Sequence, residues 1–526
     1  MKISISISIF ILLSLISFSS ADLQEKFIQC LDNQKLPNAS SIVYSPENPS
    51  FKTVLTSYIR NLRFDRPTTP KPEFIITPHL ETHVESIIVC LKTLGNIQLK
   101  IRSGGHDYEG ISYVSHVPFV LLDMFNLRSI TVDGDSKTAW VQAGATLGEL
   151  YYKIGTEYGL GFPAGVCPTV GVGGHISGGG YGNMMRKYGL SIDNVIDARI
   201  VDVNGKILNR ETMGEDLFWA IRGGGGASFG VVTAFKLNLV EVPAVVTNFQ
   251  LDRTVEENAS ELVYKWQNTI ESIDNNLFIR LLIKRAQSNE SENYTVKVTF
   301  FAQYLGDSNS LLTLMNTQFP ELGVKKTDCQ ELSWIQSLLN WHDLDIKSPK
   351  LLLSRELPTQ IYLKRKSDYV KTPISIHGLN SIWKNMTEGD IMLVFNPYGG
   401  KMHEINETAT AFPHRAGNLF KIQYAVNWED AELNMDKMYL DQSRRLYKFM
   451  KPFVSKKPRS SYLNYRDLDI GVNSFGKNSY KEGKKYGKKY FGVNFDRLVK
   501  IKTAVDPTNF FRNEQSIPVL NLVQET

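Results

Sequence analysis

Residues 165–182, GVCPTVGVGGHISGGGYG, place one of only four cysteines in front of a run of glycines. A second stretch, RSGGHDYEG at 102–110, places one of nine histidines in a similar loop. Glycine lets a backbone turn with positive φ and approach a ligand closely, and successive backbone N–H groups bind anions such as phosphate. Cys167 and His106 are nucleophilic side chains set in such loops. Their placement indicates a ligand that is held covalently.

A third glycine run, GGGG, occupies residues 223–226. None of the three loops fits G-x-G-x-x-G after a strand, and none is followed by G-K-[ST], so neither a Rossmann site nor a P-loop is supported. For any one loop, a tight turn between strands explains the glycines equally well. A lone histidine is usually structural, and Cys167 alone reads as a buried free thiol. The combination of the three loops in one region favours a binding site.

The size and composition of the chain limit its class. With 526 residues it fits two or three packed domains, and 42% hydrophobic with 21% charged residues is ordinary for a soluble globular protein. The net charge is +5, no nucleic-acid module is visible, and no C-x-x-C or H-E-x-x-H spacing predicts a metal site. Basic residues cluster at 477–489, KNSYKEGKKYGKK. This cluster reads as a solvated face, or as a means of retention on an acidic matrix such as a polyuronide cell wall.

The N-terminus predicts export. Residues 1–21 combine Lys2, an apolar run too short to span a membrane, and small residues before a cleavage site after Ala21. The mature protein is therefore expected to be secreted to the wall or apoplast, with the vacuole as an alternative. A disulfide between Cys30 and Cys90 is expected because both lie in the N-terminal part. Six glycosylation sequons fit the same route: Asn38, Asn258, Asn289, Asn293, Asn385 and Asn406.

The hydrophobic pattern predicts an α+β fold. Residues 22–69 look helical and then irregular, and 70–241 alternate short β-rich runs with helices. Thr146 with Glu149 forms a predicted capping box, and Asn204-Gly205 joins a predicted strand pair. Residues 242–455 predict an antiparallel sheet covered by helices, and 456–526 return as a short C-terminal segment.

Five stretches carry a family resemblance: RSGGHDYEG, CPTVGVGGHISGGGYG, WAIRGGGGASFG, NYRDLDIG and VDPTNFFRNEQSIP. Together they resemble the plant berberine bridge enzyme-like flavoproteins, which belong to the vanillyl-alcohol-oxidase type of FAD proteins. The similarity covers nearly the whole mature chain, with the motifs in the family's order. It implies a PCMH-type FAD-binding domain at 70–241 with its N-terminal segment 22–69, a substrate-binding domain at 242–455, and a C-terminal berberine-bridge segment at 456–526.

The resemblance implies that FAD is attached twice. In the family, the histidine of SGGHD bonds the flavin 8α-methyl carbon and the cysteine of CPT bonds C6, which are His106 and Cys167 here. Two such attachments should raise the flavin potential and prevent loss of the cofactor outside the cell. Further cofactor contacts are expected from Arg102, Ser103, Gly104, Gly105, Asp107, Thr146, Gly173, Gly174, Ser177, Gly178, Gly180, Tyr181, Gly182, Val232 and Asn464.

Five side chains are expected by the family pattern on the substrate side of the flavin: Tyr108, Tyr181, Lys421, Gln423 and Tyr465. Lys421 and Gln423 are two residues apart on one predicted strand, so they point to one face. A tyrosine with a pKa near ~10 is a poor base at neutral pH, but a nearby ammonium favours the phenolate. Lys421 is therefore expected to activate Tyr181 as the base for alcohol oxidation. Family members that form alkaloid or cannabinoid-like rings carry a glutamate in this strand, where this chain has Lys and Gln.

The residue three positions after Cys167 resembles an oxygen gatekeeper, where valine leaves a pocket open and leucine or isoleucine closes it. Here it is Val170. We therefore predict a monomeric, secreted oxidase that takes a primary, allylic alcohol of the monolignol type to the aldehyde, with O2 as acceptor and H2O2 as product. A carbohydrate oxidase stays open, as does an enzyme of oxidative cyclisation or cycloaddition. A binding or defence protein with a vestigial flavin is disfavoured because His106 and Cys167 are both present.

Overall fold

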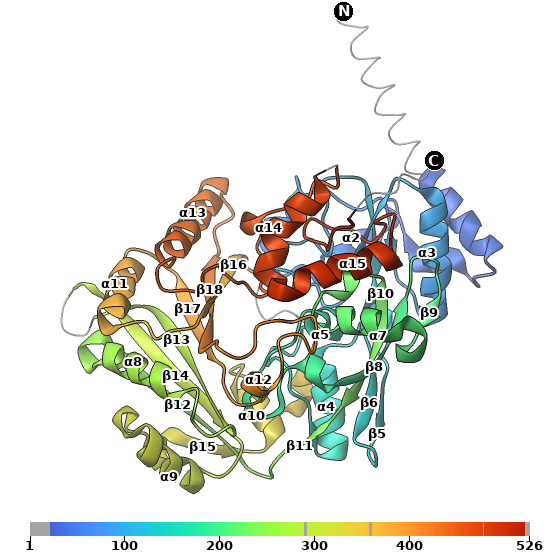
Figure 1. Ribbon diagram of the computed structural model, residues 1–526. Coiled ribbons are helices and arrows are strands. Elements are labelled where there is room, and N and C mark those ends of the chain that lie inside the picture. The colour runs from blue at the N-terminus through green and yellow to red at the C-terminus, as the bar shows by residue number, and fades with distance from the viewer. Residues whose placement is uncertain (1–21, 289–291, 357–359, 477, 521–526) are drawn as a thin grey trace, which may run out of the picture.

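The computed structural model describes residues 22–288, 292–356, 360–476 and 478–520 (Figure 1). The predicted signal peptide 1–21 and the sequon at Asn289 lie outside these residues. The fold is α+β, as predicted, and its described strands form four sheets. Asn385 is half-buried. The other described sequon asparagines are exposed: Asn38, Asn258, Asn293 and Asn406.

The first sheet carries the histidine loop at its edge. Its order is β1-β2-β4-β3, with β2, β4 and β3 parallel and β1 antiparallel to β2. The helix over 22–33 is tied to α3 by the Cys30–Cys90 disulfide, which confirms the predicted pair. The elements are β1 (Val43–Tyr44), α2 (Phe51–Thr56), β2 (Ile75–Ile76), α3 (Glu81–Leu94), β3 (Gln98–Arg102) and β4 (Phe119–Asp123).

The second sheet is antiparallel, in the order β5-β6-β10-β8-β9. The predicted hairpin joins β8 to β9, with Gly205 at φ 74°. The predicted capping box at Thr146 and Glu149 begins α4. The elements are β5 (Ile130–Asp133), β6 (Thr138–Gln142), α4 (Leu147–Tyr158), β7 (Leu160–Gly161), α5 (Val172–Ser177), α6 (Met185–Tyr188), β8 (Val195–Val201), β9 (Ile207–Leu208), α7 (Arg210–Ile221), β10 (Val231–Asn238) and β11 (Val240–Glu241), which pairs with β7.

The third sheet is antiparallel with seven strands, in the order β15-β12-β14-β13-β17-β18-β16. Its outer face packs against helices (Figure 1), so Ile422 and Tyr424 lie in that core while Lys421 and Gln423 point to the opposite face. The elements are β12 (Val246–Thr254), α8 (Ala259–Thr269), β13 (Leu277–Gln287), β14 (Tyr294–Tyr304), α9 (Ser308–Gln318), β15 (Cys329–Leu332), α10 (Trp334–Asn340), β16 (Tyr362–Val370), α11 (Ile376–Thr387), β17 (Met392–Pro397), α12 (Lys401–Glu404), β18 (Phe420–Trp428) and α13 (Leu433–Phe449).

The C-terminal segment returns across the molecule. The Tyr462 N–H donates to Ser367 on β16 at 2.9 Å, and α14 (Ser479–Phe491) and α15 (Phe495–Val505) follow. Arg497 of α15 stacks on Trp219 of α7 at 4.0 Å. Residues 461–466 therefore reach the inner face of the large sheet while the last two helices contact the glycine-rich region.

We propose domain limits at 22–69, 70–241, 242–455 and 456–526, although the packing between them is continuous. A Cβ on Gly155 of α4 would lie 2.3 Å from Ile335 of α10, so these helices touch closely. Trp334 and Leu352 lie in the same buried core as Leu150. Residues 334–352 thus pack on the glycine-rich region, although they belong by sequence to the large sheet. Among the described helices, none combines the length and hydropathy that a membrane span requires.

Candidate functional site

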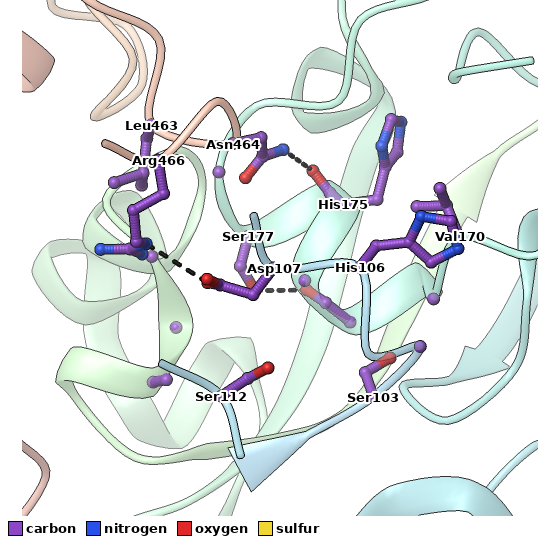
Figure 2. A pocket seen from close by; sticks show the side chains of 18 of the residues that line it. Ser103, His106, Asp107, Ser112, Val170, His175, Ser177, Leu463, Asn464 and Arg466 are labelled. Atoms are coloured by element: carbon purple, nitrogen blue, oxygen red, sulfur yellow. Dashed lines mark hydrogen bonds and ion pairs between the residues drawn. The ribbon is translucent and has the colours of Figure 1, made fainter. Parts of the chain in front are cut away.

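The three glycine loops line one cavity of about 380 Å³. The histidine loop contributes residues 103–108, the cysteine loop contributes most of 165–183, and 224–228 add a third wall. The C-terminal segment closes it with 462–466, and Arg280 and Gln423 reach in from the large sheet. Figure 2 shows part of this wall, where Asp107 is bridged to Arg466 across the cavity (Oδ2–Nε 3.5 Å).

The loops pack backbone to backbone and leave donors free. A Cβ on Gly104 would lie 2.2 Å from the Gly171 nitrogen, so only glycine fits there. Within the described residues, the backbone N–H groups of 104–107 have no acceptor. A Cβ on Gly174 would meet nothing within 4 Å. The site therefore offers successive free amides beside open space, which suits an anionic ligand pressed against the backbone.

His106 and Cys167 both face this cavity. His106 Nε2 lies 3.2 Å from Thr169 Oγ1, and burial with the nearby Arg60 lowers the pKa of His106 to about 3, so its imidazole is neutral. Burial raises the pKa of the Cys167 thiol, but His342, Arg280 and Arg60 outweigh it and hold that pKa below its ordinary value. Both side chains are thus suited to act as nucleophiles.

The five predicted substrate-side residues form one cluster. The hydroxyl groups of Tyr181 and Tyr465 are hydrogen-bonded to each other, and the Tyr108 and Tyr465 rings lie 5.8 Å apart. Gln423 Nε2 donates to the Tyr108 hydroxyl at 3.1 Å. Lys421 does not line the cavity. It is 1% exposed, and its Nζ packs against the rings of Tyr181, Tyr462 and Tyr465. The distance from Nζ to the Tyr181 ring centroid is 3.2 Å.

Charge in this cluster is set by burial and by Arg280. Burial raises the pKa of Tyr181 and of Tyr465, and raises that of Tyr108 to about 12. Arg280 opposes the shift at Tyr181. Burial, with Arg280 nearby, lowers the pKa of Lys421 well below its ordinary value. Arg280 is thus a cation acting on both Tyr181 and Lys421.

Comparison with known proteins identifies the family to which this arrangement belongs. Residues 72–210 match a family described as an FAD binding domain, and 461–518 match "Berberine and berberine like". Berberine bridge enzyme-like 8 of Arabidopsis thaliana is 57% identical over 513 residues, covering 96% of this chain and 97% of the relative.

The chain belongs to the berberine bridge enzyme-like family. It is an FAD-dependent oxidoreductase, and the resemblance seen in the sequence is confirmed.

Solved members of the family share the fold. Berberine bridge enzyme-like protein 28 of Arabidopsis thaliana has a TM-score of 0.88 at 45% identity, covering 94% of this chain and 100% of that one. The wild-type grass pollen allergen Phl p 4.0202, a glucose dehydrogenase, has a TM-score of 0.88 at 42% identity, covering 94% and 99%. A Phl p 4 variant with valine in place of one isoleucine is a glucose oxidase, with the same TM-score, identity and coverage.

The cavity fits the FAD of a berberine bridge enzyme-like protein. The free amides at 104–107 supply donors for a pyrophosphate, and the open space at Gly174 leaves the ligand room against the backbone. Most of the predicted cofactor residues line it: Ser103, Gly104, Gly105, His106, Asp107, Cys167, Gly173, Gly174, Ser177, Gly178, Tyr181, Gly182, Val232 and Asn464, together with Val170.

Three predicted cofactor residues lie outside the cavity lining. Arg102 is fully buried and pairs with Asp123 at 2.6 Å, anchoring the strand before the histidine loop. Thr146 caps α4. The Gly180 N–H donates to the Tyr462 hydroxyl at 3.1 Å. We propose that these residues support the loops rather than contact the cofactor.

Several site residues were missed from the sequence. Arg280 lies on β13, a strand for which no prediction was made, and stacks on Trp341 at 4.5 Å. An arginine between the apolar residues of FIRLLI was the available signal. The Tyr462 hydroxyl accepts a hydrogen bond from the Gly180 N–H, next to Tyr181. His175 Nε2 accepts one from the Gly165 N–H at 3.1 Å.

Proposed function

We propose that this protein is an oxidase of CH–OH donors, with FAD bonded to His106 and Cys167. One observation carries the proposal: the hydrogen-bonded hydroxyls of Tyr181 and Tyr465, backed by Lys421, share a cavity with His106 and Cys167. When bound, FAD supplies a hydride acceptor whose electrons pass on to O2 as H2O2. The cavity thus unites a candidate base with the residues that would hold that acceptor.

The base of the reaction is Tyr181. Its oxygen accepts the proton of the substrate hydroxyl, and its bond to Tyr465 orients it. Gln423 donates to the Tyr108 hydroxyl and fixes that ring as a wall of the substrate space. Tyr465 is buried, while Tyr108 and Tyr181 are half-buried and line the cavity, so a bound substrate would cover the site of proton transfer.

Two basic side chains oppose the burial that raises the pKa of Tyr181. A cation over the face of a ring is attracted by its π-electrons, and a phenolate adds negative charge to that ring, so Lys421 favours the ionised base. Arg280 opposes the burial that raises the Tyr181 pKa. Arg280 lines the cavity and supplies a second positive charge near Tyr181.

We propose O2 as the electron acceptor because the residue at the gatekeeper position is valine, Val170. This side chain lines the cavity beside the histidine loop (Figure 2). In the related pollen allergen, exchange of one isoleucine for valine separates a glucose oxidase from a glucose dehydrogenase. That pair supports the idea that the size of one aliphatic side chain selects the acceptor in this fold.

The first candidate substrate is a primary allylic alcohol of the monolignol type, which the aromatic walls at Tyr108, Tyr181 and Tyr465 suit. The second is a carbohydrate whose anomeric hydroxyl is oxidised to a lactone. The glucose-oxidising relatives support it, and so does Arg280, which has no ion pair among the described residues. A carbohydrate with a carboxylate would supply one. The third candidate reaction is oxidative cyclisation or cycloaddition.

A substrate panel with peroxide detection tests the proposal. Purified protein is mixed in air with coniferyl alcohol, glucose, cellobiose and oligogalacturonates. Peroxide from coniferyl alcohol supports the first candidate, and peroxide only from a sugar moves the assignment to the second. Silence with every alcohol and sugar overturns CH–OH oxidation and favours the ring-forming reactions. We also propose that the protein is exported and acts as a monomer.

A further inference from the structure

A basic surface spans α13, the loop after it, and α14. Between Arg444 and Lys489 the sequence holds fourteen lysines and arginines against three acidic residues, a net charge of +11, while the whole chain carries only +5. Both helices lie along the same upper side of the molecule in Figure 1. The positive charge of this protein is therefore concentrated in one region.

The loop ties the two helices into one structure. Arg459 donates to the Tyr447 carbonyl of α13 at 2.7 Å, and the Ser461 N–H donates to the Lys489 carbonyl of α14 at 3.0 Å. Arg459 and Lys489 are close enough that each charge bears on the other: burial, with Arg459 nearby, lowers the pKa of Lys489. The segment between the helices thus holds their basic faces together.

Most of this charge is exposed and uncompensated. Arg444 pairs with Asp469 and Lys488 pairs with Asp496, while Glu482 accepts hydrogen bonds from Ser474. Eight other exposed cations form no ion pair among the described residues: Arg445, Lys448, Lys451, Lys456, Lys457, Lys481, Lys484 and Lys485. We call these eight residues the basic surface.

The spacing on α14 works against the stability of the helix. Lys481 and Lys485 are four residues apart, and Lys484 and Lys488 repeat that spacing, so like charges stand together on one helical face. Such pairs destabilise a helix. The opposite face is apolar and buried through Tyr486, Tyr490 and Phe491. Only Lys488 of these four lysines is neutralised within the fold, by Asp496. The repulsion among Lys481, Lys484 and Lys485 is therefore not relieved by an ion pair among the described residues, and an external anion would relieve it.

We propose that the basic surface binds an acidic polysaccharide with a carboxylate on each sugar. An extended polyanion matches charges spread over two helices, and a protein predicted to be exported meets such polymers outside the cell. A membrane is the poorer partner, because the apolar face of α14 is buried and unavailable for insertion. The binding is separate from the active-site cavity, which none of the eight residues lines.

Binding of the full-length, flavin-loaded protein to immobilised polygalacturonate tests the proposal. Lys481→Gln/Lys484→Gln/Lys485→Gln removes three charges from the basic surface. Lys52→Gln/Lys92→Gln/Lys206→Gln removes three exposed lysines elsewhere and is the matched control. We expect affinity to fall about tenfold in the first variant only, the lower end of the effect of a charged surface on an oppositely charged partner. Binding should weaken with NaCl.

Four results overturn the proposal. If affinity for polygalacturonate falls equally in both variants, net charge explains the binding. If affinity does not fall in the Lys481/Lys484/Lys485 variant, the polymer binds at the cavity. Equal binding of a fully methyl-esterified polymer would remove the carboxylates from the interaction. Equal binding of phosphatidylserine vesicles would identify a lipid surface instead. Flavin absorbance of each variant confirms folding and is independent of the reaction proposed above.

Discussion

The Nζ of Lys421 lies 3.2 Å from the centre of the Tyr181 ring, over its face, and forms no hydrogen bond with the phenol oxygen. That oxygen is hydrogen-bonded to Tyr465 instead. Lys421 therefore influences the base through the ring. Burial, with Arg280 nearby, lowers the pKa of Lys421 itself. The expected pairing of a lysine with a tyrosine is present, but Arg280 also opposes the burial that raises the pKa of Tyr181.

Lys421→Met should raise the pH at which substrate reduces the flavin rapidly. Loss of a cation over the ring disfavours the phenolate, and we expect a rise of about 1 unit, the lower end of the shift that a neighbouring charge produces. The pH profile of anaerobic flavin reduction measures it. Lys284→Met removes an exposed lysine on the same strand as Arg280 and should leave the profile unchanged. A profile identical to wild type in Lys421→Met removes this residue from the base.

Arg280→Met and Lys421→Met should be non-additive. Removal of Arg280 lets the Lys421 pKa rise, so Lys421 gains charge and partly replaces the lost cation. The double variant loses both cations. The rise of its kinetic pKa above the wild-type value should therefore be larger than the sum of the rises in the two single variants. The same stopped-flow titration of three variants and wild type measures this, and simple additivity would show that the two cations act independently.

The sequence was sufficient for the parts of the site that are local. Glycines beside His106 and Cys167 mark close backbone approach, and the alternation of Lys421 and Gln423 marks one face of a strand. The position of Arg280 depends on which strand lies beside β17, which no local pattern reports. The packing of α10 on α4 was equally unpredictable, because it joins segments far apart in the chain.

Val170→Ile should convert the oxidase to a dehydrogenase. One added methylene narrows the space beside the cavity, and we expect reoxidation by O2 to slow by at least about tenfold, equivalent to ~1.4 kcal/mol of barrier. Reduction by substrate should be unchanged, as should turnover with an artificial quinone acceptor. Reoxidation at the wild-type rate would contradict the assignment of Val170, whereas a slowed reductive step would indicate a distorted cavity.

His106→Ala/Cys167→Ala should release flavin on denaturation, while wild type and each single variant retain it in the precipitate. Attachment at His106 should be constant above about pH 4, because its pKa of about 3 keeps the imidazole neutral there. Attachment at Cys167 should fail as pH drops, because the thiolate is the nucleophile. Mass spectrometry of flavin peptides separates the two, and a yellow precipitate of the double variant would refute both attachments.

The most direct test of the account is anaerobic stopped-flow absorbance of wild type and Tyr181→Phe mixed with coniferyl alcohol and then with cellobiose. We predict that one of them bleaches the wild-type flavin rapidly, and that air reverses the bleaching and forms H2O2. Bleaching should be slower in Tyr181→Phe, which keeps the ring beside Lys421 but lacks the proton acceptor. Bleaching at the same rate in both proteins, or in neither, would contradict an alcohol oxidase whose base is Tyr181.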